Sequence, residues 1–107
     1  MRRFAANRVC IVPEKKILRN QVVEVDEVSH EVLHIFVLEE EIRHTEWLGG
    51  MILLASHCPS RDENESFGAY IDRIGENIDS KALKAYHISA FNVNSMEFTK
   101  ESRIVLL

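Results

Sequence analysis

The chain has 107 residues, of which 46% are hydrophobic and 28% charged, and its formal net charge is −4. These values fit one globular domain over residues 1–107 and exclude a disordered chain. No apolar run approaches the ~20 residues of a membrane-spanning helix, and no signal-peptide core follows the N-terminus. We therefore expect a cytoplasmic protein that does not enter a membrane.

Charge is divided unevenly along the chain. Residues 1–19 hold six bases and one acid, whereas residues 24–46 hold eight acids and one base. A basic segment can neutralise phosphates, but the acidic total and the lack of interleaved aromatic residues argue against nucleic-acid binding. We expect the two regions to attract each other, either within one subunit or between two subunits.

Three segments of the first half are rich in β-branched residues and are predicted to be strands: 3–12, 21–26 and 32–38. The first stops at Pro13, and the charged residues 14–19 predict a turn. In the second strand, alternation places Val23 and Val25 on one face and Glu24 and Asp26 on a solvated face. The third is expected to be more buried and to return beside the first.

The middle of the chain changes character. Residues 39–46 are charged and predict a loop or short helical turn, and Gly49-Gly50 predicts a bend before the apolar run 51–55. Residues 60–78 follow helical spacing, with Phe67, Tyr70, Ile71, Ile74 and Ile78 on one face. Ser60 and Glu63 match a capping box at the start of this helix.

Strand patterns return at residues 83–93 and 103–107. Five or six strands and one helix, at about residues 60–78, predict a mainly β domain. We expect a small β-sandwich or a partly open barrel.

The segment His30-Glu31-Val32-Leu33-His34 has the form of a zinc-protease motif. That chemistry needs a helix, because only there do residues i and i+4 stand close enough to share one zinc. In a strand the two histidines stand ~13 Å apart at ~3.3 Å per residue. The surrounding β-branched residues favour a strand, so we expect no metal or catalytic role for His30, Glu31 and His34. A small zinc-dependent hydrolase that uses them remains the alternative.

Other reactive side chains stand in weaker patterns. Glu39, Glu40, Glu41 and His44 have no recognised spacing for a third zinc ligand. Cys10 and Cys58 have neither zinc nor disulfide spacing and are expected to be reduced packing residues. Cys58 with His57 or His87 as base, and a ligand held at the barrel mouth by Trp47 and Tyr86, are two further alternatives.

Two pieces of the chain resemble the small β domain of the amidohydrolase (metal-dependent hydrolase) superfamily. They are residues 1–57, with Phe4–Val9, Val23–Asp26 and Leu48-Gly49-Gly50, and the tail 83–107, with Thr99 and Arg103–Leu106. In that family the first piece leads into a catalytic barrel and the tail returns to the β domain. Here roughly one helix stands between them.

The likeness departs from the family where the chemistry lies. The family has a Pro-Gly and then a His-x-His metal pair, whereas this chain has Ala55-Ser56, His57 and Pro59. The resemblance therefore implies a freestanding accessory domain to which no catalytic residue and no cofactor carries over. We expect a non-catalytic module that acts by self-association, as a homodimer, or by binding a protein partner, because strand edges and apolar patches invite pairing.

Overall fold

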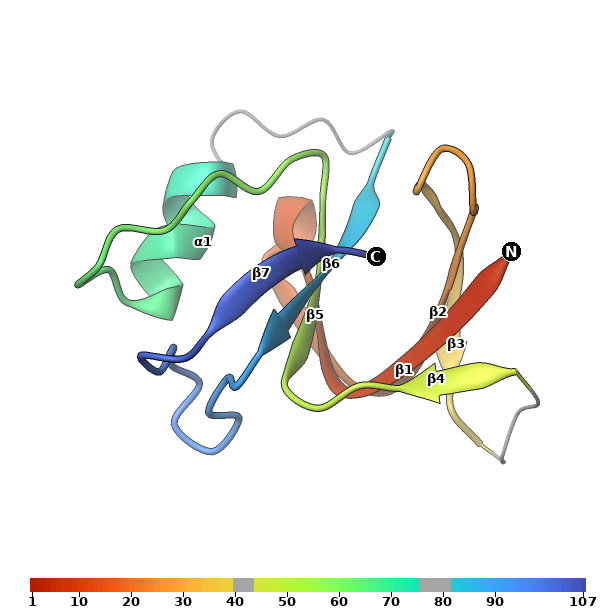
Figure 1. The fold of residues 1–107 in the computed structure, drawn as a ribbon, viewed down its shortest axis with the longest axis horizontal. Helices are drawn as coiled ribbons and strands as arrows, with labels where there is room; N and C mark the ends of the chain where they lie inside the picture. Colours follow the sequence, from red (N-terminus) through yellow and green to blue (C-terminus); the bar gives the residue numbers. More distant parts are fainter. Residues whose placement is uncertain (40–43, 76–81) are drawn as a thin grey trace.

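The computed structural model describes residues 1–39, 44–75 and 82–107, and Figure 1 shows their fold. Seven strands, one short 3-10 helix and one α-helix lie within these residues. Their bounds are β1 Arg2–Ile11, η1 Val12–Glu14, β2 Lys16–Val25, β3 Val32–Val37, β4 Thr45–Trp47, β5 Met51–Ala55, α1 Phe67–Gly75, β6 Lys84–Ser89 and β7 Arg103–Leu106. The predicted mainly β fold with one helix is confirmed.

β1 is the central strand of one sheet, whose order is β3-β2-β1-β5-β6-β7. β2 runs antiparallel to β1 along the whole of its length, with Arg2 opposite Val25 and Ile11 opposite Lys16. On its other side β1 has two parallel partners in succession, β4 beside its first half and β5 beside its second half. β1 therefore joins the N-terminal strands to β5, β6 and β7.

The sheet curls so that the start of β3 meets the start of β6. Glu31, just before β3, forms an isolated bridge with Lys84 at the start of β6, and the Val32 amide donates to the Leu83 carbonyl at 2.8 Å. Figure 1 shows the two parts of the sheet curving around a common interior. The result is a small, partly open barrel, one of the two architectures that the sequence predicts.

The barrel interior is filled with apolar side chains from both parts of the sheet. Its buried residues are Phe4, Ala6, Val9, Val23, Val25, Ile52, Leu54 and Ala85. Because burial of each aliphatic side chain contributes about 1.5–3 kcal/mol, this interior holds the sheet in its curled form.

A second core lies between α1 and the outer side of β5 and β6. Phe67, Tyr70, Ile71 and Ile74 of α1 are buried against β5 side chains that point away from the barrel, and α1 lies on that side in Figure 1. The Phe67 ring meets the Phe91 ring edge-on at 4.9 Å between centroids. Within the described residues, no helix combines the length and the apolar character needed to cross a bilayer.

The helix lies inside the predicted range but begins later, at Phe67, while residues 76–78 lie outside the described chain. The expected capping box of Ser60 and Glu63 does not start it. Instead, the Ser66 hydroxyl accepts from the Ala69 amide at 3.1 Å, and the Glu97 carboxylate accepts from the Phe67 amide at 2.7 Å. A cap supplied from a distant segment is invisible to a local motif search.

A bidentate ion pair between Glu65 and Arg73 joins the segment before α1 to the helix. Arg73 donates to both carboxylate oxygens of Glu65 at 2.8 Å. These bonds favour the charged carboxylate and lower the pKa of Glu65 to about 2.

We expect the contribution of Glu65 to stability to depend on acid pH. Its pKa falls from 4.5 to about 2 on folding, so its contribution is complete above pH 4.5 and is lost as the pH falls through about 2. The difference in Tm between the native chain and Glu65→Gln should therefore shrink across this window in thermal melts. Glu63→Gln, at an exposed neighbouring position, should leave the pH dependence unchanged, and an equal effect of both variants would contradict the assignment.

The predicted turn at 14–19 is wrong in extent. The reversal takes only η1 and Lys15, whose φ of 50° is left-handed, and β2 begins at Lys16. The predicted solvated face of this strand is also wrong, because Glu24 is only 8% exposed. Sequence alternation shows which residues share a face but not whether neighbouring side chains cover that face.

β3 was expected to be more buried than β2 and to lie beside β1, but it is more exposed than the buried half of β2 and pairs along its length with β2. It lies at one side of the sheet order, and Leu33 and Val37 are 45% and 56% exposed, whereas the last five residues of β2 are all buried. A register shift opposite Glu24 and Val25 places Leu33 in a β-bulge. The strand predicted at 83–93 is shorter than expected and ends at Ser89.

The paired glycines form the expected bend between β4 and β5. Ala5 pairs with Trp47, but Arg8 pairs with Met51, so this side of the ladder contains one extra residue. Gly50 has a φ of 86°, and a Cβ at this position would overlap the Ile88 carbonyl oxygen. Gly50 therefore permits both the bulge and the close approach of β6.

Gly50→Ala should destabilise the protein by about 2–4 kcal/mol, because left-handed strain adds to a backbone clash. Gly49→Ala is the matched control, since a Cβ there meets nothing within 4 Å. It should change the free energy of unfolding by less than about 0.5 kcal/mol in denaturant titrations. Equal effects at the two glycines would contradict this account.

Candidate interaction surface

The three residues of the zinc-protease pattern do not share one helical face. His30 precedes β3 with a φ of 63°, and its Nδ1 lies 2.7 Å from the Leu107 carbonyl oxygen. Glu31 pairs with Lys84, and His34 stands within β3 with its Nδ1 3.5 Å from a Glu24 carboxylate oxygen. The strand predicted here is present, the two histidine side chains have different neighbours, and Glu31 is placed by a backbone bridge.

The described residues contain no group of three or more histidine, cysteine or acidic side chains arranged to hold a metal ion. Cys10 and Cys58 are both free, and burial raises the pKa of each thiol to about 12. A thiol that stays protonated at neutral pH is a weak nucleophile. His87 contacts the Gly49 carbonyl through its Nε2 rather than either cysteine.

Trp47 and Tyr86 do not line the barrel mouth. Tyr86 packs against the core beneath α1, on the side of β6 opposite the interior residue Ala85. Trp47 pairs with Ala5, whose neighbours Phe4 and Ala6 point into the barrel. Both aromatic side chains therefore lie outside the barrel.

The outer side of the N-terminal strands carries an apolar row. Ala5 is opposite Trp47 on β4 and opposite Val22 on β2, and Val22 is opposite Phe36 on β3. Residues directly opposite in a sheet share a face, so four strands contribute to one surface. We call Trp47, Ala5, Val22 and Phe36 the aromatic face.

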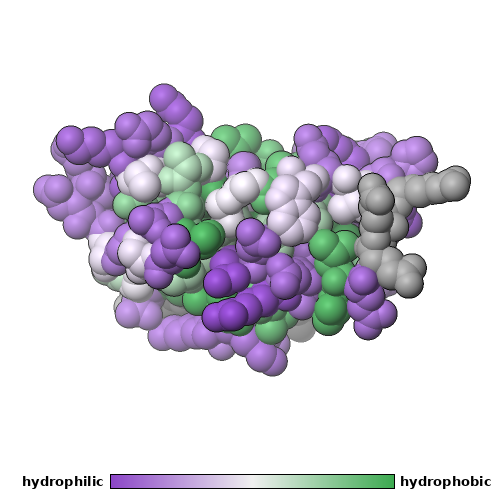
Figure 2. Space-filling model, turned by 90° about the horizontal axis from the view of Figure 1, so that it is seen from below, coloured by the Kyte–Doolittle hydropathy of each residue, from purple (hydrophilic) through white to green (hydrophobic). Residues whose placement is uncertain are grey.

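Exposure differs sharply along the aromatic face. Ala5 and Val22 are 1% and 0% exposed, whereas Trp47 is 52% exposed at the β4 end. Tryptophan is enriched at protein contact surfaces relative to the rest of a protein surface. Figure 2, seen from below, shows hydrophobic side chains at the surface next to the grey residues, set among hydrophilic ones.

A charged row runs beside the aromatic face. Arg3 is opposite Thr45 and Glu24, and Glu24 is opposite His34. The Arg3 Nε donates to the Glu24 carboxylate at 3.0 Å, and only 10% of the Glu24 side chain is exposed. The basic and acidic regions therefore form ion pairs within one subunit. Besides Arg3–Glu24, Arg2 pairs with Glu46 at 3.2 Å.

The hydroxyl of Thr45 stands out in this charged row. Its oxygen is buried without a hydrogen-bond partner in the described part of the chain. Such an atom costs free energy unless a further group reaches it. The two rows could not be found in the sequence because they join positions that only the strand register brings together, although the single tryptophan of the chain was a visible signal.

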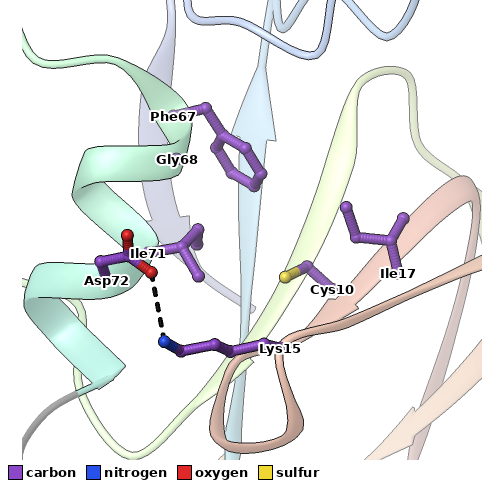
Figure 3. A pocket seen from close by; sticks show the side chains of 7 residues that line it. All are labelled: Cys10, Lys15, Ile17, Phe67, Gly68, Ile71 and Asp72. Atoms are coloured by element: carbon purple, nitrogen blue, oxygen red, sulfur yellow. Dashed lines mark ion pairs between the residues drawn. The ribbon is translucent and has the colours of Figure 1, made fainter.

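A separate apolar groove lies between α1 and the β1–β2 hairpin. Figure 3 shows Phe67 and Ile71 on one wall and Cys10 and Ile17 on the other, with the Lys15–Asp72 ion pair of 3.3 Å across its edge. Its volume is about 230 Å³. The cysteine in it is a buried thiol, so the groove offers shape and apolar contact but no reactive group.

Comparison of the chain with protein-family models, with curated proteins and with solved structures finds no match.

We expect Glu24→Gln to destabilise the protein by about 1–3 kcal/mol, because Arg3 and His34 lose the carboxylate that joins them in a partly buried setting. Glu46→Gln breaks the solvent-exposed pair with Arg2 and should cost less than about 0.5 kcal/mol. Chemical denaturation of both variants measures the difference. Comparable losses would show that the charged row has no special structural role.

Proposed function

We propose that this chain is a non-catalytic β module that acts by association, with the aromatic face as its contact surface and a second copy of the chain as its partner. The observation that carries the proposal is Trp47, which is 52% exposed at the end of an apolar row crossing four strands. Tryptophan is among the residues that contribute most binding energy at protein interfaces, since its large ring loses water contact on binding.

The surroundings of Trp47 support self-association in particular. The charges of the adjacent row are paired within the subunit, Arg3 with Glu24, so two copies related by a twofold axis can bring their aromatic faces together without like-charge repulsion from this pair. Phe36 brings the row to β3, an outer strand of the sheet with Leu33 and Val37 exposed. Outer strands with apolar side chains favour pairing with another chain.

The resemblance to the accessory β domain of the amidohydrolase superfamily supports the same role. Such a domain leans on a catalytic barrel, and α1 packs here against the β5–β6 side of the sheet. The zinc-hydrolase alternative gains no support from His30 and His34, since β3 is a strand and each histidine has its own neighbour.

A protein partner and a cytoplasmic setting complete the proposal. The net charge of −4 disfavours a nucleic acid as the main partner, because it opposes the phosphate field. The free Cys10 and Cys58 agree with a reducing compartment.

The native chain should form a dimer in sedimentation or in size-exclusion chromatography with light scattering. Trp47→Ser should raise the dimer dissociation constant at least roughly thirtyfold, the equivalent of a hot-spot residue of about 2 kcal/mol. Because Trp47 is the single tryptophan, its emission should also shift to shorter wavelength as the concentration rises.

Val105→Ser is the matched control, since Val105 is 54% exposed on β7, at the other side of the sheet order. It should leave the dimer unchanged. A strict monomer at high concentration would refute self-association, and a dimer that Val105→Ser dissociates while Trp47→Ser does not would place the interface elsewhere.

A further inference from the structure

The basic N-terminal segment is only partly neutralised by the fold. Arg2, Arg3 and Lys15 each have an acidic partner within ion-pair distance. In the described ranges, no carboxylate lies within 4.0 Å of the charged groups of Arg8 and Arg19. These two guanidinium groups therefore remain available to an anion that is not part of the described chain.

The register brings the two unpaired arginines together. Arg8 of β1 is directly opposite Arg19 of β2, so their side chains leave the same face of the sheet. Like charges in this position destabilise a strand pair, and each guanidinium has five N–H donors. One N–H of Arg8 donates to the Asn7 carbonyl at 3.1 Å, which leaves most of its donors free.

Both arginines line a groove of about 410 Å³ together with polar and apolar side chains. Asn94 and the apolar residues Ile17, Val93 and Met96 line the same groove.

Hydrogen bonds to the Asn92 side chain stabilise the turn that carries Asn94. The Asn92 side-chain oxygen accepts from the Asn94 and Ser95 amides at 3.0 and 3.1 Å, and Asn92 forms a bridge with Glu97. The Asn94 side-chain amide has no hydrogen-bond partner within the described chain, so it is free to bind a ligand.

We propose that this groove binds a small phosphate monoester, with the phosphate between Arg8 and Arg19 and an apolar substituent against Ile17, Val93 and Met96. Two guanidinium groups match the charge of a phosphate monoester, about −1.5 to −2 at pH 7, better than that of a single carboxylate. Planar N–H forks also bind phosphate oxygens in pairs. Asn94, which lies between β6 and β7 and lines the same groove, adds a neutral donor.

Phenyl phosphate is the probe, and amide chemical shifts of the full-length chain are the readout. Titration should shift the amides of Arg8, Arg19 and Asn94 in a saturable way. Arg8→Gln and Arg19→Gln should each weaken binding roughly tenfold, because each removes a charge-assisted pair of hydrogen bonds. Affinity should fall as the pH drops below about 6, where the phosphate takes up its second proton.

Three controls make the test decisive. Arg103→Gln removes an exposed arginine on β7 and should leave binding unchanged. Inorganic phosphate and benzoate, which lack the apolar group and the second charge respectively, should each bind several-fold more weakly. Arg8→Gln and Arg19→Gln should not lower Tm, since each relieves a repulsion between like charges.

The proposal is overturned if phenyl phosphate produces no saturable shift in the groove, or if Arg103→Gln weakens binding as much as Arg8→Gln does. Equal affinity for inorganic phosphate would refute the apolar side chains as part of the site, and equal affinity for benzoate would refute the assignment to a phosphate dianion.

Discussion

The structure depends on the pairing of β1 with neighbouring strands along both of its edges. One side of this strand is occupied by β2, and the other is shared between β4 and β5, which are parallel to it and offset by one residue. The offset requires Gly50, whose backbone conformation and close contact with Ile88 exclude a side chain. Because of this shared edge, the first half of β1 carries the aromatic face and its second half forms part of the core beneath α1.

Much of the fold could be predicted from local patterns. The β-branched runs gave β1 and β3, the paired glycines gave the bend before β5, and the helical spacing of Phe67 and Tyr70 gave α1. Burial could not be predicted in this way. Glu24 alternates as a solvated residue would, but Arg3 and His34 cover it, and these contacts depend on pairing across three strands.

The candidate sites could be predicted even less well, because they depend on the strand register. The uneven charge along the chain indicated that the basic segment would find partners, but only the register shows that Arg3 is paired while Arg8 faces Arg19. Trp47 was visible as an isolated tryptophan, yet its row with Val22 and Phe36 joins residues far apart in the sequence. The zinc-protease pattern failed for a local reason, because a motif has meaning only on the element that its geometry requires.

The parallel pairing of β1 with β5 also constrains the order in which the chain can fold. β1, β2 and β3 follow one another through short connections, so they can pair early. The pairing of β1 with β5, in which Val9 lies opposite Ile52, can form only later. Closing so long a loop costs entropy before any contact compensates for it. Until β5 arrives, β1 presents an apolar edge with unpaired backbone groups, and a nascent or partly unfolded chain is at that stage most prone to aggregate.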